Sequence, residues 1–489
     1  MPVVPLLDVN KGRGSKEQLF VATIKEAPEA TQLQLAKAVY GKATPANLQA
    51  LQKLQSRVRV KLLNQLYFLD HTDPRHLISR RYELECLDLL HKVSVLYAER
   101  DFRLAERLLL RCLRQAEEGE FTQYVVLAAR MLRNLYVERR QPILYKKISK
   151  VLQKAQQQLA WEDEAEQVQA DTQLVGNNTV AARRMLLTTL PGQIAQLETL
   201  HRRAHSFTSY NMLYRVRMLY EELQGQFVAM IRIAAAAARD LQAGKLNARR
   251  FDLRYNHFVT IYAYLRSRQP VRGLQLAEEY IRDFHPSSSN WFYFQEHHLL
   301  LALHAGRYEL AQQLLDTVAK NSAFVGQREA ALQRWDLYRS YTNFVLPAPR
   351  VQSARQRQVA QQMLLLPEYS RDKRGHNVAI LVLQLLYFLR ERNLEPVLLR
   401  LERLRKYQQR HLTEASTLRS RLFLRLLQVI VEKNFDPKKA AERGQGLFQQ
   451  LRDTPPPGEA FAEVEIIPYE NLWGIVLELL REGPPVAVA

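Results

Sequence analysis

The sequence predicts an all-α protein, and three observations support that prediction. Apolar residues recur at steps of three and four along almost the whole chain, the spacing that lines one face of a helix. Alternating β-branched runs bounded by turns, which would indicate strands, are nearly absent. Hydrophobic residues make up 47% and charged residues 25% of the 489 residues, an ordinary globular composition. We therefore expect a folded helical chain made of several domains or of one elongated array.

Two segments show the helical spacing and also match each other. Residues 102–109 follow the pattern FxLAxxLL, and residues 308–315 follow YxLAxxLL. In the first segment, the stripe formed by Leu104, Leu108 and Leu109 is expected to face a neighbouring helix. This match is an internal repeat.

A junction made of an apolar helix end, basic residues and a new helix recurs along the chain. Some neighbouring junctions are 39 residues apart (100 to 139, and 268 to 307) and others 41 apart (392 to 433). A period near 40 holds two helices of about 15 residues and two short turns. Such a pair cannot bury its apolar faces alone, so we expect the pairs to stack on one another. The junctions lie near Arg100, Arg139, Arg268, Arg307, Arg392 and Lys433.

The spacing, the leucine and aromatic positions and the equivalent small residues Ala105, Ala277 and Ala311 resemble the tetratricopeptide (TPR) family. The resemblance covers residues 83–345 well and residues 378–451 loosely. It implies a TPR-like α-solenoid of stacked antiparallel helix pairs. Residues 366–377, LPEYSRDKRGHN, also look like a segment of uncharacterised bacterial TPR-like proteins.

Proline and glycine clusters divide the chain, because both residues break helices. The clusters are LPAP at 346–349, the stretch from 366 to 375, and PPPG at 455–458. With the N-terminal module they predict five segments. These are an N-terminal helical module (1–75), helical repeats (76–345), a connector (346–375), C-terminal helical repeats (376–454), and a Pro-rich break with a capping helix (455–489).

The N-terminal module has the clearest local pattern. Helices are expected over 16–27 and 32–40, followed by a turn in which Thr44 caps a third helix and Pro45 occupies its first position. That third helix carries Lys53, Arg57, Arg59 and Lys61. The arrangement resembles helix-turn-helix domains, and LAKAVYG at 35–41 is similar to winged-helix activators, which implies DNA contact by the basic helix. The alternative is a helical hairpin that caps the repeat array.

The formal net charge of +20 comes from 70 Lys and Arg against 50 Asp and Glu, and favours anionic partners without choosing among them. Half of the excess lies in residues 350–425, where sixteen basic residues face six acidic ones. On a helix expected over residues 394–409, the basic side chains of Arg403, Lys406 and Arg410 lie opposite the apolar side. Either a solvated face or a phosphate-tracking surface accounts for them.

The chain lacks common motifs for catalysis and for cofactor or metal binding. The chain has no GxSxG, no GxGxxG and no HExxH, and Gly41-Lys42 lacks the hydroxyl residue of a phosphate loop. His297, His298 and His304, near Glu296, are interpreted as structural, as are the neighbouring aromatic residues. We therefore expect no enzyme activity, no cofactor and no metal.

The cellular setting is predicted from cysteines and apolar runs. Cys86 and Cys112 form no CxxC pattern and are expected to be core thiols in a reducing compartment. The longest apolar run, 378–389, is about half the length of a membrane span. A cytoplasmic protein with no membrane partner is expected.

The predicted function is a non-enzymatic scaffold whose concave helical groove holds a segment of another protein. The TPR resemblance implies that inner-helix residues, among them Arg103, Arg107 and Arg111, clamp an acidic segment or a carboxylate terminus. The alternative is a transcription-related DNA-binding regulator in which Lys53, Arg57 and Lys61 face the nucleic acid.

Overall fold

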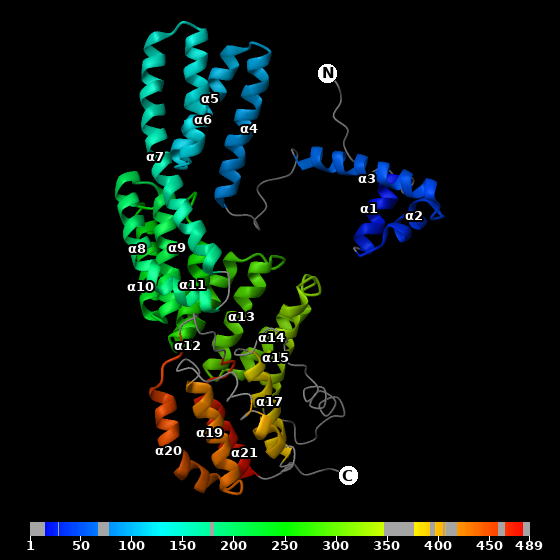
Figure 1. Ribbon diagram of the computed structural model, residues 1–489, viewed down its shortest axis with the longest axis vertical. Coiled ribbons are helices and arrows are strands. Elements are labelled where there is room, and N and C mark those ends of the chain that lie inside the picture. Colours follow the sequence, from blue (N-terminus) through cyan, green and yellow to red (C-terminus); the bar gives the residue numbers. More distant parts are fainter. Residues whose placement is uncertain are drawn as a thin grey trace. The chain divides into compact units, whose positions relative to one another are not determined.

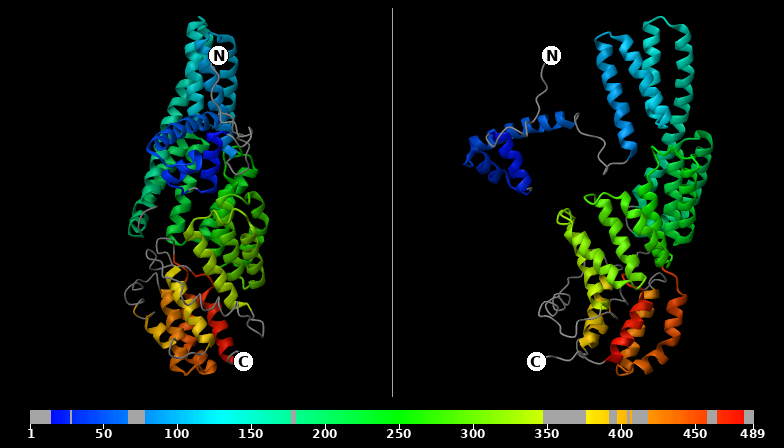
Figure 2. Two further views of the ribbon diagram at one scale, coloured as in Figure 1. Left: turned by 90° about the vertical axis from the view of Figure 1, so that its right-hand side faces the viewer. Right: turned by 180° about the vertical axis from the view of Figure 1, so that it is seen from behind.

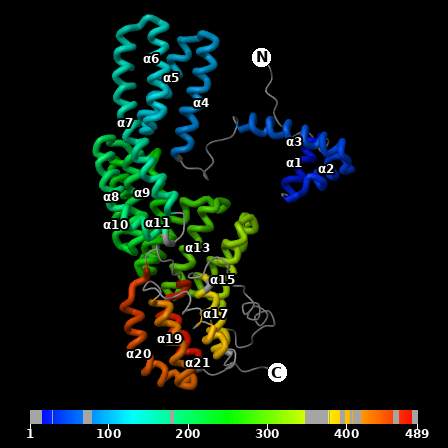
Figure 3. The backbone as a smooth tube through the Cα atoms, in the orientation of Figure 1, coloured from blue at the N-terminus to red at the C-terminus, as the bar shows by residue number. Residues whose placement is uncertain are grey.

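The computed structural model separates the chain into two compact units, Met1–His76 and Leu77–Ala489. All regular elements in the part of the chain that it describes are helices, which confirms the all-α prediction (Figures 1 and 3). The predicted division into five segments remains a prediction. The described residues are 15–27, 29–66, 78–176, 180–346, 376–391, 397–403, 406, 418–457 and 465–482. The predicted connector therefore lies almost entirely outside them.

The first unit consists of three helices, α1 (Lys16–Glu26), α2 (Gln32–Tyr40) and α3 (Pro45–Gln65). Ser15 and Thr31 each form a capping box, in which side chain and backbone hydrogen-bond reciprocally at the helix start. As predicted, Thr44 caps α3 and Pro45 takes its first position. The small apolar core of this unit consists of Phe20, Leu35, Ala36, Val39, Leu51, Leu54 and Val58.

In the second unit, consecutive helices pack on one another along the chain, and several alternate helices, α4 with α6, α7 with α9 and α11 with α13, also touch. Figure 2 shows this unit from two further sides. The first eight helices are α4 (Ile78–Ala98), α5 (Phe102–Glu118), α6 (Thr122–Glu138), α7 (Pro142–Gly176), α8 (Val180–Ala204), α9 (Phe207–Gln224), α10 (Phe227–Gln242) and α11 (Leu253–Arg266). Next come α12 (Pro270–Tyr280), the 3₁₀ turn η2 (Ile281–Asp283), α13 (Ser289–His304), α14 (Tyr308–Lys320) and α15 (Glu329–Val345). The last are α17 (His376–Glu391), α19 (Leu418–Glu432), α20 (Pro437–Asp453) and α21 (Tyr469–Glu482).

One turn geometry ends eight of the described helices. A residue with positive φ follows the helix, and the next N–H bonds to the carbonyl five residues earlier, the 6→1 bond of a Schellman motif. Asp101 N to Leu96 O, at 3.0 Å, is one such bond. The positive-φ residues are Arg100, Glu120, Arg140, Gly225, Gly244, Arg268, Gly306 and Asn434. Several of the predicted junctions therefore coincide with a turn of this kind.

The helices differ in how many of their faces are buried. α5 buries one face, consisting of Ala105, Leu109, Cys112, Leu113 and Ala116. Leu104, predicted to lie on that face, is 40% exposed instead, because five residues turn a helix by about 140° beyond one full turn and so point Leu104 away from the side of Leu109. In contrast, α13 buries eleven of its sixteen residues. α13 is thus an inner element and α5 a peripheral one.

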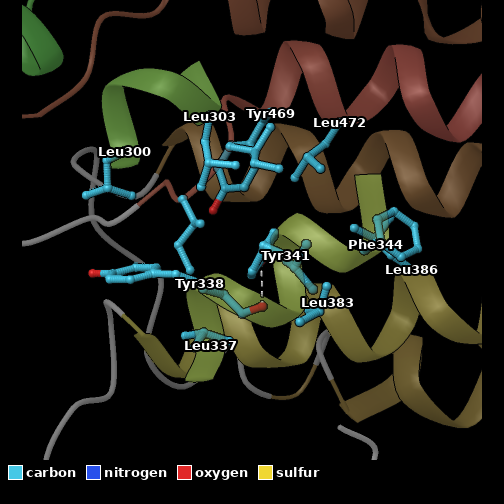
Figure 4. Packing of buried hydrophobic residues seen from close by; sticks show 14 of the residues in the cluster. Leu300, Leu303, Leu337, Tyr338, Tyr341, Phe344, Leu383, Leu386, Tyr469 and Leu472 are labelled. Atoms are coloured by element: carbon cyan, nitrogen blue, oxygen red, sulfur yellow. Dashed lines mark hydrogen bonds between the residues drawn. The ribbon is translucent and has the colours of Figure 1, made fainter. Parts of the chain in front are cut away.

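The largest core cluster runs from α11 to α21 and includes the tyrosines and leucines shown in Figure 4. The last described helix, α21, packs into it through Trp473, which lies close to Gly444 of α20. A Cβ at Gly444 would lie 3.3 Å from Trp473 and 3.0 Å from Leu426.

None of the described helices has the length and apolar character needed to cross a membrane.

Candidate functional site

The second unit contains a cavity of about 560 Å³, here called the α13 cavity, which is lined by both polar and apolar side chains. Side chains four residues apart on three helices line it, so each helix turns one stripe toward the space. His376, at the start of α17, and residues between 456 and 471 complete the wall. The stripes are Tyr262 and Arg266 on α11, Tyr293 with His297 and Glu296 with Leu300 and His304 on α13, and Arg334 with Tyr338 on α15.

On one side of the cavity, a buried ion pair joins α13 to α15. Arg334 Nε and Nη2 donate to the two carboxylate oxygens of Glu296 at 2.9 and 3.2 Å. The hydroxyl of Tyr338 donates to the same carboxylate at 2.6 Å. Three donors therefore hold Glu296 in one orientation.

These contacts keep the carboxyl group of Glu296 ionised. Burial alone would raise the pKa of Glu296, but the hydrogen bonds and charge of Arg334, together with the Tyr338 hydroxyl, outweigh it and lower that pKa. Burial also raises the pKa of Tyr338, so its proton stays on the phenol. A carboxylate that is ionised and already holds three donors is a poor general base, because its basicity has been reduced. The arrangement suits fixed recognition better than proton transfer.

Two other side chains of the cavity wall, Arg266 and His304, bond to the backbone carbonyls of Pro457 and Glu465. Arg266 Nη2 donates to the carbonyl of Pro457 at 2.6 Å. His304 Nε2 bonds to the carbonyl of Glu465 at 2.9 Å; a carbonyl only accepts, so this nitrogen carries the proton. Burial lowers the pKa of His304, which leaves Nδ1 of the neutral ring as an acceptor. Pro456, Pro457 and Glu465 thus form part of the cavity wall.

Arg419, on α19, bonds to two carboxylates of the cavity wall and to two backbone carbonyls at the end of α20. Its side chain is 1% exposed and bonds to both Glu465 and Glu470, with Nη2 to Glu470 Oε2 at 2.9 Å. Nη1 donates to the carbonyls of Leu451 and Thr454 at 2.7 Å each. Burial acts to lower the pKa of Arg419, but the two carboxylates outweigh it and raise that pKa. This arginine, part of the basic cluster in residues 350–425, is therefore a core residue and not part of a solvated face.

Aromatic side chains form the apolar wall. The ring centroids of His297 and Tyr262 lie 5.4 Å apart with the rings nearly perpendicular. Tyr293 is 41% exposed, whereas its neighbours Phe292 and Phe294 are buried. Phe292 and Phe294 are thus core residues, as the sequence analysis expected. Tyr262, Tyr293 and His297 were also interpreted as structural, and they line the cavity. Apolar walls with a few fixed polar groups are typical of ligand-binding sites.

The predicted clamp residues Arg103, Arg107 and Arg111 lie elsewhere, on α5. All three are exposed and lie on the face opposite the buried one, together with Arg114. None of them lines the α13 cavity. The structure thus brings these arginines together on one helix face, separate from the cavity.

The predicted nucleic-acid residues of the first unit do not share one face. Lys53 and Arg57 are exposed on one flank of the buried stripe of α3, whereas Arg59 is exposed on the other flank, since each residue turns the helix by 100°. Lys61 Nζ is paired with Glu17 of α1 at 2.7 Å. Lys53 and Arg57 are therefore the two of these four side chains that point in a common direction and have no acidic partner among the described residues.

The remaining predicted residues are partly described. Residues 397–403 are helical with Val397 and Leu401 buried, and Arg403 and Lys406 are exposed as expected. Lys406 pairs with Glu402 at 2.8 Å. Arg410 lies outside the described residues. Within the described part of the chain, no three His, Cys, Asp or Glu side chains gather as metal ligands.

The two cysteines are buried and free, as predicted for core thiols. Cys112 Sγ lies 3.7 Å from the carbonyl oxygen of Cys86.

No family model, no curated protein and no solved structure matches this chain.

Proposed function

We propose that this chain is a helical-repeat scaffold, built as a TPR-like α-solenoid of stacked helix pairs, that binds a segment of a partner protein in the α13 cavity. The proposal rests on one observation: three alternate helices, α11, α13 and α15, each turn a stripe of side chains into one space. In repeat proteins, binding surfaces arise in this way, because equivalent helices of successive repeats line a common surface.

The recurring turn supports the repeat architecture. Positive-φ residues at 100, 120 and 140 divide the first four helices of the second unit into equal steps of 20 residues. Each step ends with the same 6→1 hydrogen bond, at 2.8 to 3.0 Å. Two such steps make one helix pair, which agrees with the period near 40 in the sequence.

The chemistry of the cavity wall supports peptide binding over catalysis. Glu296 has three bound donors and Glu465 is held by Arg419, so the carboxylates are already neutralised. Tyr293, Leu300 and Pro270 offer apolar surface to a side chain of a bound segment. A segment could bury an apolar side chain there while its backbone meets the polar rim.

A peptide-display selection tests the proposal. A random library of 12-residue peptides is panned on the full-length protein, and an enriched peptide is labelled and measured by fluorescence anisotropy. Tyr293→Ala should weaken its binding at least tenfold, because exposed tyrosines at binding sites are frequent hot spots. Tyr145→Ala on α7 is the matched control, since Tyr145 is 39% exposed and lies outside the cavity.

The control variant should bind within twofold of the wild type. If the two tyrosine variants bind the peptide equally, the α13 cavity is not a peptide site. The same conclusion follows if panning on the wild type enriches no peptide more strongly than panning on the Tyr293→Ala protein. Circular dichroism of both variants checks that the helices are retained.

A further inference from the structure

The first turn of α7 presents exposed apolar side chains at one end of the second unit (Figure 1). Pro142 begins the helix, and the next three residues, Ile143, Leu144 and Tyr145, are 81%, 37% and 39% exposed. Successive residues of a helix are 100° apart, so these three side chains point in three different directions around the helix axis. This first turn, residues 142–145, is called the α7 tip here.

The part of α7 behind the tip carries only positive charge. Residues 142–160 contain four lysines and no acidic residue. All four lysines are exposed and have no ion pair with a described residue. Helix geometry places them within 100° of one another, on the same side as Ile143 and opposite the buried Ile148 and Leu152. These lysines, here called the lysine face, are Lys146, Lys147, Lys150 and Lys154.

Acidic residues near the tip do not neutralise this charge. The turn between α4 and α5 lies at the same end of the unit, because Glu106 of α5 pairs with Arg139 after α6. That pair uses one acid, and Asp101 is used as the cap of α5. Residues 99–106 and 138–154 together contain eight basic and four acidic residues, a net charge of +4. The end of the unit is therefore both apolar and positively charged.

We propose that the α7 tip and the lysine face bind the surface of an anionic membrane. The helix rise of 1.5 Å per residue places Lys146 and Lys147 about 4.5–6 Å behind Ile143 along the axis. The headgroup region of one leaflet is about 5–7.5 Å thick. With Ile143 at the edge of the hydrocarbon, these two lysines therefore lie among the anionic headgroups. Tyr145 suits this depth, because tyrosine is enriched at membrane interfaces.

The shape and chemistry of the tip favour a lipid surface over a nucleic acid or a protein. A sugar-phosphate backbone would pair with the lysine face but has little apolar surface for Ile143. A protein partner would need a socket around the helix end, because the apolar side chains point in three directions. Lipid surrounds an inserted tip from every side and also supplies anionic headgroups. Such binding needs no membrane-spanning segment, on which the expectation of no membrane partner rested.

This surface is independent of the function proposed for the α13 cavity. No residue of the α7 tip or of the lysine face lines that cavity. Peptide binding in the cavity and vesicle binding by the tip can therefore be measured separately in the same variants.

Vesicle co-sedimentation of the full-length protein tests the proposal. Vesicles with about 30% phosphatidylserine in phosphatidylcholine are compared with pure phosphatidylcholine vesicles at about 0.1 M salt, where the Debye length is about 10 Å. The wild type should bind the anionic vesicles at least tenfold more tightly, because several lysines near the surface each contribute to binding.

A substitution at the tip tests the apolar contribution. Ile143→Asp should weaken binding to the anionic vesicles at least tenfold, since a carboxylate is excluded from hydrocarbon and repelled by the headgroups. Val271→Asp is the matched control, because Val271 is 64% exposed and also follows a proline that begins a helix, Pro270 of α12. The control should bind within twofold of the wild type.

A triple substitution tests the charge. Replacing Lys146, Lys147 and Lys150 with Gln should weaken binding to the anionic vesicles at least tenfold. The control replaces three exposed cations of α10 and α14 that also have no ion pair with a described residue, and it should bind within twofold of the wild type. These control residues are Arg232, Arg239 and Lys320. Circular dichroism of each variant verifies that Gln, a good helix former, preserves the helices.

A fluorescent label measures insertion directly. Ile143→Cys carries an environment-sensitive label (NBD) attached through its thiol, and both natural cysteines are buried, so the label goes to position 143. Its emission should shift to shorter wavelength on the anionic vesicles, as expected for an apolar environment. The same label on Val271→Cys should show no shift.

Four results would overturn the proposal. Equal affinity for the two kinds of vesicle, or no vesicle binding, would exclude an anionic membrane as the partner. An equal loss in Val271→Asp would mean that added negative charge anywhere on the protein reduces binding. An unchanged spectrum at position 143, with binding still lost in the lysine variant, would mean that charge alone adsorbs the protein. Duplex DNA that binds the wild type but not the lysine variant, while Ile143→Asp retains vesicle binding, would assign the lysine face to nucleic acid.

Discussion

The guanidinium of Arg334 on α15 holds the carboxylate of Glu296 on α13 with two parallel hydrogen bonds, at 2.9 and 3.2 Å. The two residues are 38 positions apart, close to the repeat period, and come from the stripes that line the α13 cavity. The side chain of Glu296 is 12% exposed and that of Arg334 is 22% exposed. The ion pair therefore fixes the relative position of two cavity helices.

Breaking this pair from its two ends should have unequal effects. Arg334→Gln leaves a buried carboxylate without its cation and should lower the free energy of unfolding by about 3 kcal/mol. Glu296→Gln leaves the more exposed arginine, which can reach water, and should cost about half as much. Denaturant unfolding followed by the fluorescence of the buried Trp335 measures both, with Arg328→Gln as an exposed control. Equal losses for the two variants would contradict this reading.

The turn residues offer a stabilising substitution. Arg140 has φ of 53° and is exposed, and a side chain at such an angle crowds its own backbone. Arg140→Gly should raise the free energy of unfolding by about 0.5–1 kcal/mol, because Gly adopts this region without steric cost. Glycine already occupies the equivalent position at Gly306, with φ of 69°. Differential scanning calorimetry should show a higher Tm, and an unchanged or lower Tm would mean that the arginine side chain contributes more than its strain costs.

A buried histidine should make stability depend on pH. Burial lowers the pKa of His298 to about 4, and neither ring nitrogen has a hydrogen-bond partner among the described residues. The unfolded chain binds this proton near pH 6.5, so the contribution of neutral His298 is fully present above that pH and is lost as the pH falls toward 4. The loss from this group should be about 3 kcal/mol.

His298→Phe isolates this contribution. The variant cannot take up the proton, so its free energy of unfolding should fall less steeply between pH 6.5 and 4 than that of the wild type. The same comparison cancels the other groups that titrate in this range, among them His201, His257 and His304, whose pKa values burial also lowers. Parallel curves for wild type and variant would show that His298 is protonated without cost.

The sequence predicts the helices well because their signals are local. Thr44 and Pro45 mark the start of α3, and the basic residues between apolar helix ends mark turns such as the one at Arg140. The α13 cavity was not predicted because its wall joins residues from 262 to 471, which only tertiary packing brings together. One signal was present in the sequence: Glu296, Leu300 and His304 recur at steps of four on α13 and so share one face of that helix. The other apolar residues of α13 are enough to form its core, so this partly polar face indicated a further role.

Charge was the least informative signal, because the sequence does not reveal which cations are paired. Arg419 lies in the most basic stretch and is nonetheless buried among carboxylates 46 and 51 residues further on. Arg103 and its neighbours on α5 keep the exposure that helical spacing predicts. Pairing over long sequence distances decides between these two outcomes, and spacing on one helix cannot show it.

The DNA-binding alternative leads to a salt-dependence prediction. Lys53 and Arg57 share one flank of α3, Arg59 lies on the other, and Lys61 is held by Glu17. A duplex approaching one flank can therefore meet two cations of the four, so a plot of log affinity against log salt should have a slope of about −2 from this unit. Removing residues 1–75 should reduce the slope of the full-length protein by that amount.

Single variants separate the two flanks. Lys53→Gln and Arg57→Gln should each reduce the slope by about 1, since each removes one phosphate contact. Arg59→Gln and Lys61→Gln are the matched controls and should leave the slope unchanged, because the first points away and the second is already neutralised by Glu17. If all four substitutions reduced the slope equally, the helix would have to present both flanks to the duplex, as a recognition helix lying in the major groove does. That result would favour the DNA-binding regulator over the scaffold.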